Sequence, residues 1–156
     1  MQITYFVTGK TNLAPIQQIT AEYYKRLSRY ARFEEVVIDN TAIKSTDPQL
    51  IKQREGELLL KKILPTDFLI LLDEKGKEYT SVGYAEYLQK LFLQSHKRIC
   101  FVVGGAYGFS DAVYTRANAK LCLSKMTFSH QIIRVVFAEQ LYRAFTILHN
   151  EPYHHQ

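Results

Sequence analysis

The first candidate site is a glycine-rich segment, Gly104-Gly105-Ala106-Tyr107-Gly108, which directly follows the apolar run Ile99–Val103. Backbone at residues without a Cβ can approach a ligand closely, and the carboxyl end of a parallel strand is a frequent ligand site. A dinucleotide-binding loop would need a glycine where Ala106 stands, and a phosphate-binding P-loop would need a Gly-Lys-Ser/Thr that is absent. NAD and ATP are therefore disfavoured, and the spacing leaves a small-ligand site and a simple tight turn both open.

The second candidate is the mixed segment Leu123–His130, which lies between a short apolar stretch and the last predicted helix. Its serine, threonine and histidine side chains suit a cap for that helix. They equally suit a loop whose backbone N–H and C=O groups wrap a small ligand, with Leu123 and Phe128 packed on its rings. Spacing alone does not decide between these two interpretations.

Basic and aromatic residues alternate towards the C-terminus, at Arg134, Tyr142, Arg143, Tyr153, His154 and His155. A solvated helix face followed by a frayed end has this composition. So does a nucleic-acid surface, because arginines neutralise phosphates and an aromatic ring can stack on an extruded base. The net charge of +5 suits a polyanionic partner without requiring one.

We predict no metal site. The two cysteines, Cys100 and Cys122, have neither zinc nor redox spacing, and each lies in an apolar stretch. Buried thiols are the favoured interpretation.

The elements that must position these residues follow from apolar periodicity. Strands are predicted over residues 3–7, 33–38, 68–72, 99–103 and 121–123, with a loop over 73–76. Helices are predicted over residues 15–29, 47–63, about 80–92 and about 131–150, with a short one starting at 110–111. Strands and helices alternate, so we predict an α/β fold with a mainly parallel sheet and helices on both faces.

The bulk composition predicts one globular domain. The 156 residues are 47% hydrophobic and 22% charged, which excludes disordered and fibrous classes. No apolar run approaches the ~20 residues that span a bilayer, and the first ten residues carry no basic leader or cleavable apolar stretch. We therefore expect a cytoplasmic protein without a membrane partner.

The last predicted helix is apolar on nearly every side, from Ile132 to Leu148. A terminal helix normally covers one sheet face, so the excess indicates either a partner subunit or an unusually large internal core. We favour a homodimer.

Several stretches, taken together and in order, resemble a known family. They are Leu71-Leu72-Asp73 with Gly76-Lys77, Phe101–Gly108, Ser124–Gln131, Arg134-Val135-Val136, Glu139–Ala144 and Pro152-Tyr153-His154. The chain resembles, over essentially its whole length, the 23S rRNA pseudouridine N3-methyltransferases called RlmH. The last thirty or so residues are much more specific than the glycine loop.

The resemblance implies a SPOUT fold with a C-terminal trefoil knot, a homodimer, and S-adenosylmethionine held in the knot largely by backbone. It implies a donor pocket of Leu72, Gly104, Leu123, Ser124, Lys125, Met126, Thr127 and Phe128. Many family members carry proline where Ser129 stands, which puts the rigidity of this loop in question. The family has no separate RNA-binding domain, so substrate contacts are expected from both subunits.

The resemblance also implies the reaction, methylation of N3 of a pseudouridine in 23S rRNA. It places Tyr153 and His154 at the substrate base as catalytic candidates, and Arg134, Tyr142 and Arg143 are the candidate RNA contacts. A tail that follows the knot helix is expected to lie over the donor pocket. The rival functions are a non-catalytic ribosome-binding or assembly factor and a SPOUT methyltransferase acting on tRNA, and both are disfavoured.

Overall fold

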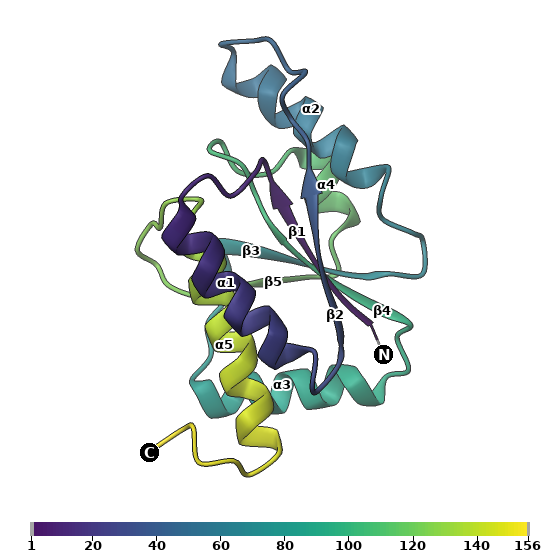
Figure 1. Cartoon of the computed structure of the whole chain (residues 1–156). Coiled ribbons are helices and arrows are strands. Elements are labelled where there is room, and N and C mark those ends of the chain that lie inside the picture. The colour runs from purple at the N-terminus through teal and green to yellow at the C-terminus, as the bar shows by residue number, and fades with distance from the viewer. Residues whose placement is uncertain (1, 156) are drawn as a thin grey trace.

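The computed structural model describes residues 2–155 of the chain. Within them, five strands form one parallel sheet in the order β2-β1-β4-β3-β5, with helices between the strands along the chain (Figure 1). The elements in chain order are β1 Gln2–Thr8, α1 Ala14–Leu27, β2 Arg32–Ile38, α2 Pro48–Leu60, β3 Phe68–Lys77, α3 Ser81–Leu93, β4 Arg98–Val103, α4 Asp111–Arg116, β5 Ala119–Leu121 and α5 Ile132–Leu148. The predicted α/β fold is confirmed, whereas the trefoil knot stays a prediction.

Three helices begin at cap residues that are visible in the sequence. Asp47 accepts a hydrogen bond from the backbone N–H of Gln49 at 3.0 Å, with Pro48 at the first helical position of α2. Thr80 and Ser110 cap α3 and α4 in the same way. Each cap pairs an amide that the helix itself leaves without a partner.

The central strand β4 is covered on both faces of the sheet. Ile99, Phe101 and Val103 belong to one apolar core, and Cys100 and Val102 belong to a second core on the opposite face. Helices α1, α3 and α5 cover the first core, while α2 and α4 cover the second (Figure 1). This two-sided burial explains the unbroken apolar sequence of the strand. It also confirms that the Cys100 thiol is buried.

The pairing of β3 with β5 differs from the sequence prediction. The loop predicted over residues 73–76 is wrong, because β3 continues to Lys77, and β5 covers residues 119–121 instead of 121–123. Lys77 pairs with Leu121 after an irregularity in register. Gly76 permits this course, since a Cβ there would lie 2.6 Å from the carbonyl carbon of Leu121. Close backbone approach has overridden the low strand propensity of the polar residues.

Helix α5 is buried on several sides because it packs on two helices as well as on the sheet. It contacts α1 and α3. The Phe137 ring centroid lies 4.4 Å from that of Tyr5 and 4.9 Å from that of Phe101. Much of the apolar surface that prompted the dimer prediction is therefore used inside the chain, although Ile132 is 44% exposed. Among the described residues, no helix has the length and apolar character to cross a membrane.

Candidate functional site

A cleft of about 800 Å³ opens at the carboxyl ends of β3, β4 and β5. Three segments form most of its lining: the end of β3 from Leu72 to Lys75, the glycine loop Gly104–Phe109, and the segment from Leu121 to Ile133. Lys52 of α2 and Asp111 and Tyr114 of α4 also line it. Both candidate segments of the sequence analysis thus meet in one site. Its position is the usual one for a ligand in a parallel α/β sheet, and its volume is in the range of small-molecule sites.

The glycine loop forms one wall of the cleft. A Cβ on Gly104 would lie 3.3 Å from the Phe109 ring and 3.4 Å from the Gly108 backbone, so this position has little room for a side chain. Gly108 adopts a φ of +77°, which favours glycine. Beyond them, Tyr107 lines the cleft and is 49% exposed, an aromatic side chain to which the sequence analysis gave no role.

The second candidate segment forms the facing wall. Leu123, Ser124, Met126, Thr127 and Phe128 all line the cleft, as do Leu72 and Gly104 from the other walls. Seven of the eight residues predicted to hold the donor are therefore brought together. Lys125 is the exception, because its side chain points to Glu78, with Nζ 3.4 Å from a carboxylate oxygen.

The floor of the cleft near β3 carries a carboxylate that the sequence analysis placed in a loop and left without a role. Asp73 accepts hydrogen bonds from the Tyr114 hydroxyl and from the backbone N–H of Lys75, the latter at 2.7 Å. Burial, and then the hydrogen bond to Asp73, raise the pKa of Tyr114 to about 12. Tyr114 therefore stays protonated at neutral pH and is a hydrogen-bond donor.

Arg134 links the start of α5 to the end of β1 and the loop after it through hydrogen bonds. Its side chain is fully buried. Nε donates to the carbonyl of His130 at 3.0 Å, Nη1 to the Thr11 hydroxyl at 2.7 Å and Nη2 to the carbonyl of Thr8 at 2.8 Å. The structure gives this guanidinium a place inside the chain and no surface for the RNA contact predicted for it.

The tail lies at the other end of α5. Tyr153 donates a hydrogen bond from its hydroxyl to Glu139 at 3.2 Å, and its ring packs edge-on against Tyr142. The Arg143 guanidinium lies 4.9 Å from the Tyr153 ring centroid, and its Nη1 lies 3.4 Å from His154 Nδ1. Four of the predicted catalytic and RNA-contacting residues therefore form one cluster.

The residues of this cluster do not line the cleft of the same chain. Helix α5 begins beside the cleft, runs for 17 residues and ends at the tail (Figure 1). Measured along the helix from Ile133, which lines the cleft, to Glu139 and Arg143, which contact the tail, the separation is roughly 9–15 Å at ~1.5 Å per residue. No tail residue lines the cleft of its own subunit, so a role for the tail at the donor pocket stays a prediction.

Comparisons with known proteins agree with this architecture. A family model described as a predicted SPOUT methyltransferase matches residues 1–154. A protein of Parabacteroides distasonis is 52% identical over 157 residues, and one of Flavobacterium psychrophilum is 50% identical over 157 residues. A protein of Porphyromonas gingivalis is 46% identical over 157 residues. Each alignment covers both chains completely, and all three proteins are named ribosomal RNA large subunit methyltransferase H. The chain therefore belongs to the SPOUT methyltransferases and, within them, to the ribosomal RNA large subunit methyltransferase H family.

Proposed function

We propose that this protein transfers the methyl group of S-adenosylmethionine to N3 of a pseudouridine in 23S rRNA. The names of its full-length relatives support the enzyme class and the ribosomal RNA substrate. The observation that carries the proposal is the cleft, in which two segments distant in sequence meet at the carboxyl ends of parallel strands. The same chemistry would place the protein in the cytoplasm, with the ribosomes.

The residues of the cleft fit this donor. Leu72, Leu123 and Phe128 offer apolar surface for the adenine ring, and backbone at Gly104 and in the Ser124–Thr127 segment offers N–H and C=O groups. A side chain at position 104 would be crowded by Phe109 and Gly108, which agrees with a cleft surface formed here by backbone atoms. When bound, the donor supplies a methyl group already activated by its sulfonium. The protein must then chiefly align that methyl group with N3 and remove the N3 proton.

We propose that Tyr153 helps to align the base with the methyl group and that His154 removes the N3 proton. Burial, and then the hydrogen bond with Tyr23, raise the pKa of Tyr153 above its ordinary value, so its hydroxyl stays protonated at neutral pH. Tyr153 is therefore suited to stack on the base or donate a hydrogen bond to it. His154 is the proposed proton acceptor, and the N3 proton lies between two carbonyls, which makes a strong base unnecessary.

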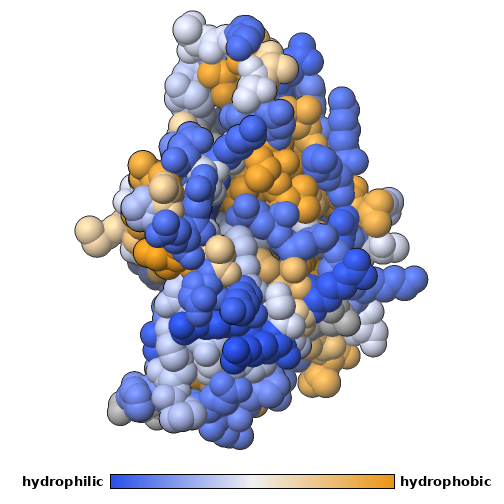
Figure 2. All heavy atoms as spheres, in the orientation of Figure 1, coloured by the Kyte–Doolittle hydropathy of each residue, from blue (hydrophilic) through white to orange (hydrophobic). Residues whose placement is uncertain are grey.

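The distance between tail and cleft supports a homodimer in which the tail of one subunit serves the cleft of the other. The apolar edge where α1 and α5 begin offers a surface for this contact. Leu13 is 53% exposed and Ile132 is 44% exposed, and the Asn12 N–H joins the two segments by donating to Gln131 at 3.0 Å. Figure 2 shows apolar atoms reaching the surface at this edge, whereas the end of α1 is hydrophilic.

The dimer proposal is tested by placing a charge in this edge. Ile132→Asp should convert a dimer to monomers in sedimentation, because a carboxylate buried without a partner costs several kcal/mol. Lys25→Asp, at an exposed position far along α1, is the matched control and should stay dimeric. A wild-type chain that sediments as a monomer at micromolar concentration would remove the proposal.

For RNA contacts we propose cations at the cleft as well as Arg143. Lys52 and Lys75 line the cleft, and neither ammonium forms an ion pair within residues 2–155. Arg143 is already paired with Glu139, so its attraction for phosphate is weakened. Tyr142 packs among Tyr23, Tyr30 and Tyr153 and would act by supporting the tail.

The reaction is tested by mass spectrometry of rRNA after ribosomes that lack the modification are incubated with the protein and S-adenosylmethionine. We expect the mass of one methyl group to be added to a pseudouridine nucleotide of 23S rRNA. Methylation of tRNA instead would support the tRNA alternative. A protein that binds ribosomes but no donor would support the non-catalytic assembly factor.

A further inference from the structure

Glu55 on α2 is a buried carboxylate with one oxygen left without a partner. The residue is 7% exposed. Its Oε1 accepts a hydrogen bond from Asn40 Nδ2 at 2.8 Å, but Oε2 is buried and has no hydrogen-bond partner among residues 2–155. Buried carboxylate oxygens are almost always paired, so an unpaired one needs an explanation.

Asp67, the other buried carboxylate among residues 2–155, shows what full pairing requires. Asp67 receives hydrogen bonds on both oxygens from Arg98, and the Leu64 N–H also donates to it, at 2.6 Å. Asp67 lies just before β3, at the amino end of that strand and away from the cleft. Glu55, which lacks such a set of donors, lies instead behind a wall of the cleft.

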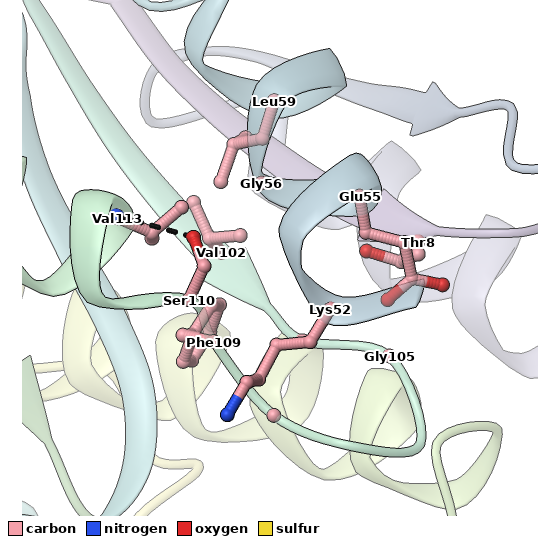
Figure 3. Close-up of a pocket in the computed structure, with 12 residues that line it drawn as sticks. Thr8, Lys52, Glu55, Gly56, Leu59, Val102, Gly105, Phe109, Ser110 and Val113 are labelled. Atoms are coloured by element: carbon pink, nitrogen blue, oxygen red, sulfur yellow. Dashed lines mark hydrogen bonds between the residues drawn. The ribbon is translucent and has the colours of Figure 1, made fainter. Parts of the chain in front are cut away.

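That wall is the glycine loop, and Glu55 occupies the place where a side chain of Gly105 would be. A Cβ on Gly105 would lie 2.9 Å from Cδ of Glu55 and closer still to the unpaired Oε2. Figure 3 shows the Glu55 side chain on α2 with the loop that carries Gly105 beside it. A side chain at position 105 would therefore displace either the loop or the Glu55 carboxylate, which lies on the far side of the loop from the cleft.

A small pocket lies against the same carboxylate. Its volume is about 10 Å³, which is about the space that a single water molecule needs. Its polar lining includes Thr8, Lys52, Glu55 and Ser110, and the backbone of Gly104, Gly105 and Gly108 closes it on the side of the cleft. A water molecule here would have Oε2 of Glu55 and the loop backbone within its surroundings.

We propose that Glu55 is a positioning residue for the donor site, which holds the glycine loop in its donor-binding course by contact with Gly105 and through a water molecule in this pocket. The inference rests on the proposed function, since it assumes that the loop contacts S-adenosylmethionine. Glu55 does not line the cleft and touches no reacting group. It acts through the loop, and its effect falls on donor affinity.

The proposal is tested by a double-mutant cycle on donor binding. The four proteins are the wild type, Glu55→Ala, Gly105→Ala and the double variant, and the probe is S-adenosylhomocysteine in calorimetry. Glu55→Ala should weaken binding roughly tenfold, the scale of one hydrogen bond to a charged group. Gly105→Ala should weaken it at least as much, because its Cβ pushes the loop off the carboxylate. In the double variant this clash is gone, so its affinity should exceed that of Gly105→Ala.

Further variants separate positioning from folding. Glu55→Gln keeps the side-chain shape and the acceptor for Asn40 but replaces Oε2 by a donor, so it should fold with a thermal midpoint close to the wild type and still bind the probe more weakly. Its methylation rate at saturating donor should be little changed. Glu57→Gln, an exposed residue of the same helix, is the control and should bind normally.

Two outcomes would overturn the inference: additive losses in the cycle, or unchanged affinity in a folded Glu55→Gln protein. These differ from failure of the proposed function, in which the wild type itself would not bind the probe.

Discussion

The two ends of α5 differ in the residues that surround them. At the start of the helix, a buried arginine binds two carbonyls and a hydroxyl, and the adjoining cleft combines loop backbone and apolar side chains with charged residues such as Asp73 and Lys75. At its end, part-exposed aromatic and charged side chains such as Tyr142, Arg143 and Tyr153 pack on one another. The start of α5 is held by hydrogen bonds inside one subunit, and the cleft beside it suits a small ligand of complementary shape. The part-exposed side chains near the end of α5 suit contact with a large substrate that must bind and dissociate.

The largest effect is expected from removing the tail. Truncation after Glu151 should abolish methylation of ribosomes while leaving the affinity for S-adenosylhomocysteine unchanged, because the cleft is built without the tail. Calorimetry and a methylation assay on the same preparation measure the two. If the truncated protein methylated ribosomes at the full rate, the tail at the end of α5 would have no role in the reaction.

Mixing experiments sharpen this prediction. The truncated chain keeps an intact cleft, and a Gly104→Val chain keeps an intact tail. If the tail serves the partner's cleft, mixed dimers assayed at a donor concentration that saturates the wild type but not the Gly104→Val chain should show more activity than either variant alone. No recovery in verified mixed dimers would contradict a tail that serves the partner's cleft.

The second effect is on stability and compares two arginines of one helix. Arg134→Met removes the donor of three part-buried hydrogen bonds, to two carbonyls and a hydroxyl, and should lower the free energy of unfolding by about 3 kcal/mol. Arg143→Met removes one part-exposed ion pair and should cost less than about 1 kcal/mol. Urea unfolding of both variants gives the comparison. Equal losses would contradict the distinction drawn between the two ends.

His154→Ala tests the proposed proton acceptor. It should reduce the methylation rate by roughly 100-fold, which is within the range for loss of a general base, with donor affinity unaffected. A single-turnover assay at saturating donor isolates this step. A rate within a few-fold of the wild type would leave Tyr153 or solvent to receive the proton.

Gly104→Val tests the other end of the comparison, where backbone forms the site. The added side chain would press on Phe109 and on the backbone of Gly108, so the loop must shift and donor affinity should fall roughly tenfold or more. Calorimetry measures the affinity, and circular dichroism checks that the variant is folded. An unchanged affinity in a folded protein would move the donor away from Gly104.

The smallest effect is expected from Arg143→Ala in RNA binding. Because Glu139 already neutralises much of its charge, the variant should lose only a few-fold in ribosome affinity, and the loss should shrink as salt is raised. Lys52→Ala, which removes an ammonium without an ion pair, should lose more. The reverse order would show that the tail cluster releases Arg143 from Glu139 on contact with RNA.

Much of the fold was predictable because its signals are local. The caps at Asp47, Thr80 and Ser110 and the apolar run of β4 gave the elements and their parallel order. The course of β3 beyond Leu72 was not predictable, because it depends on backbone contact between Gly76 and β5, far away in sequence.

For the site, the sequence located the cleft but not the roles of its charged residues. Arg134 and Arg143 are the same residue type on one helix. Only tertiary contacts make Arg134 a buried hydrogen-bond donor and Arg143 a part-exposed cation. Glu55 could not be distinguished from its exposed neighbour Glu57, because α2 must first be docked on the loop that carries Gly105.

The strand order also bears on how the chain is made. β1 leaves the ribosome before the other described elements, yet it lies in the interior of the sheet between β2 and β4. Its second edge stays open until residues 98–103 have been synthesised, and the cleft cannot close before β5 and the segment to Ile133 follow. Parallel pairing over such separations folds slowly and leaves apolar edges exposed meanwhile. Synthesis must therefore reach at least Ile133 before the donor site exists at all.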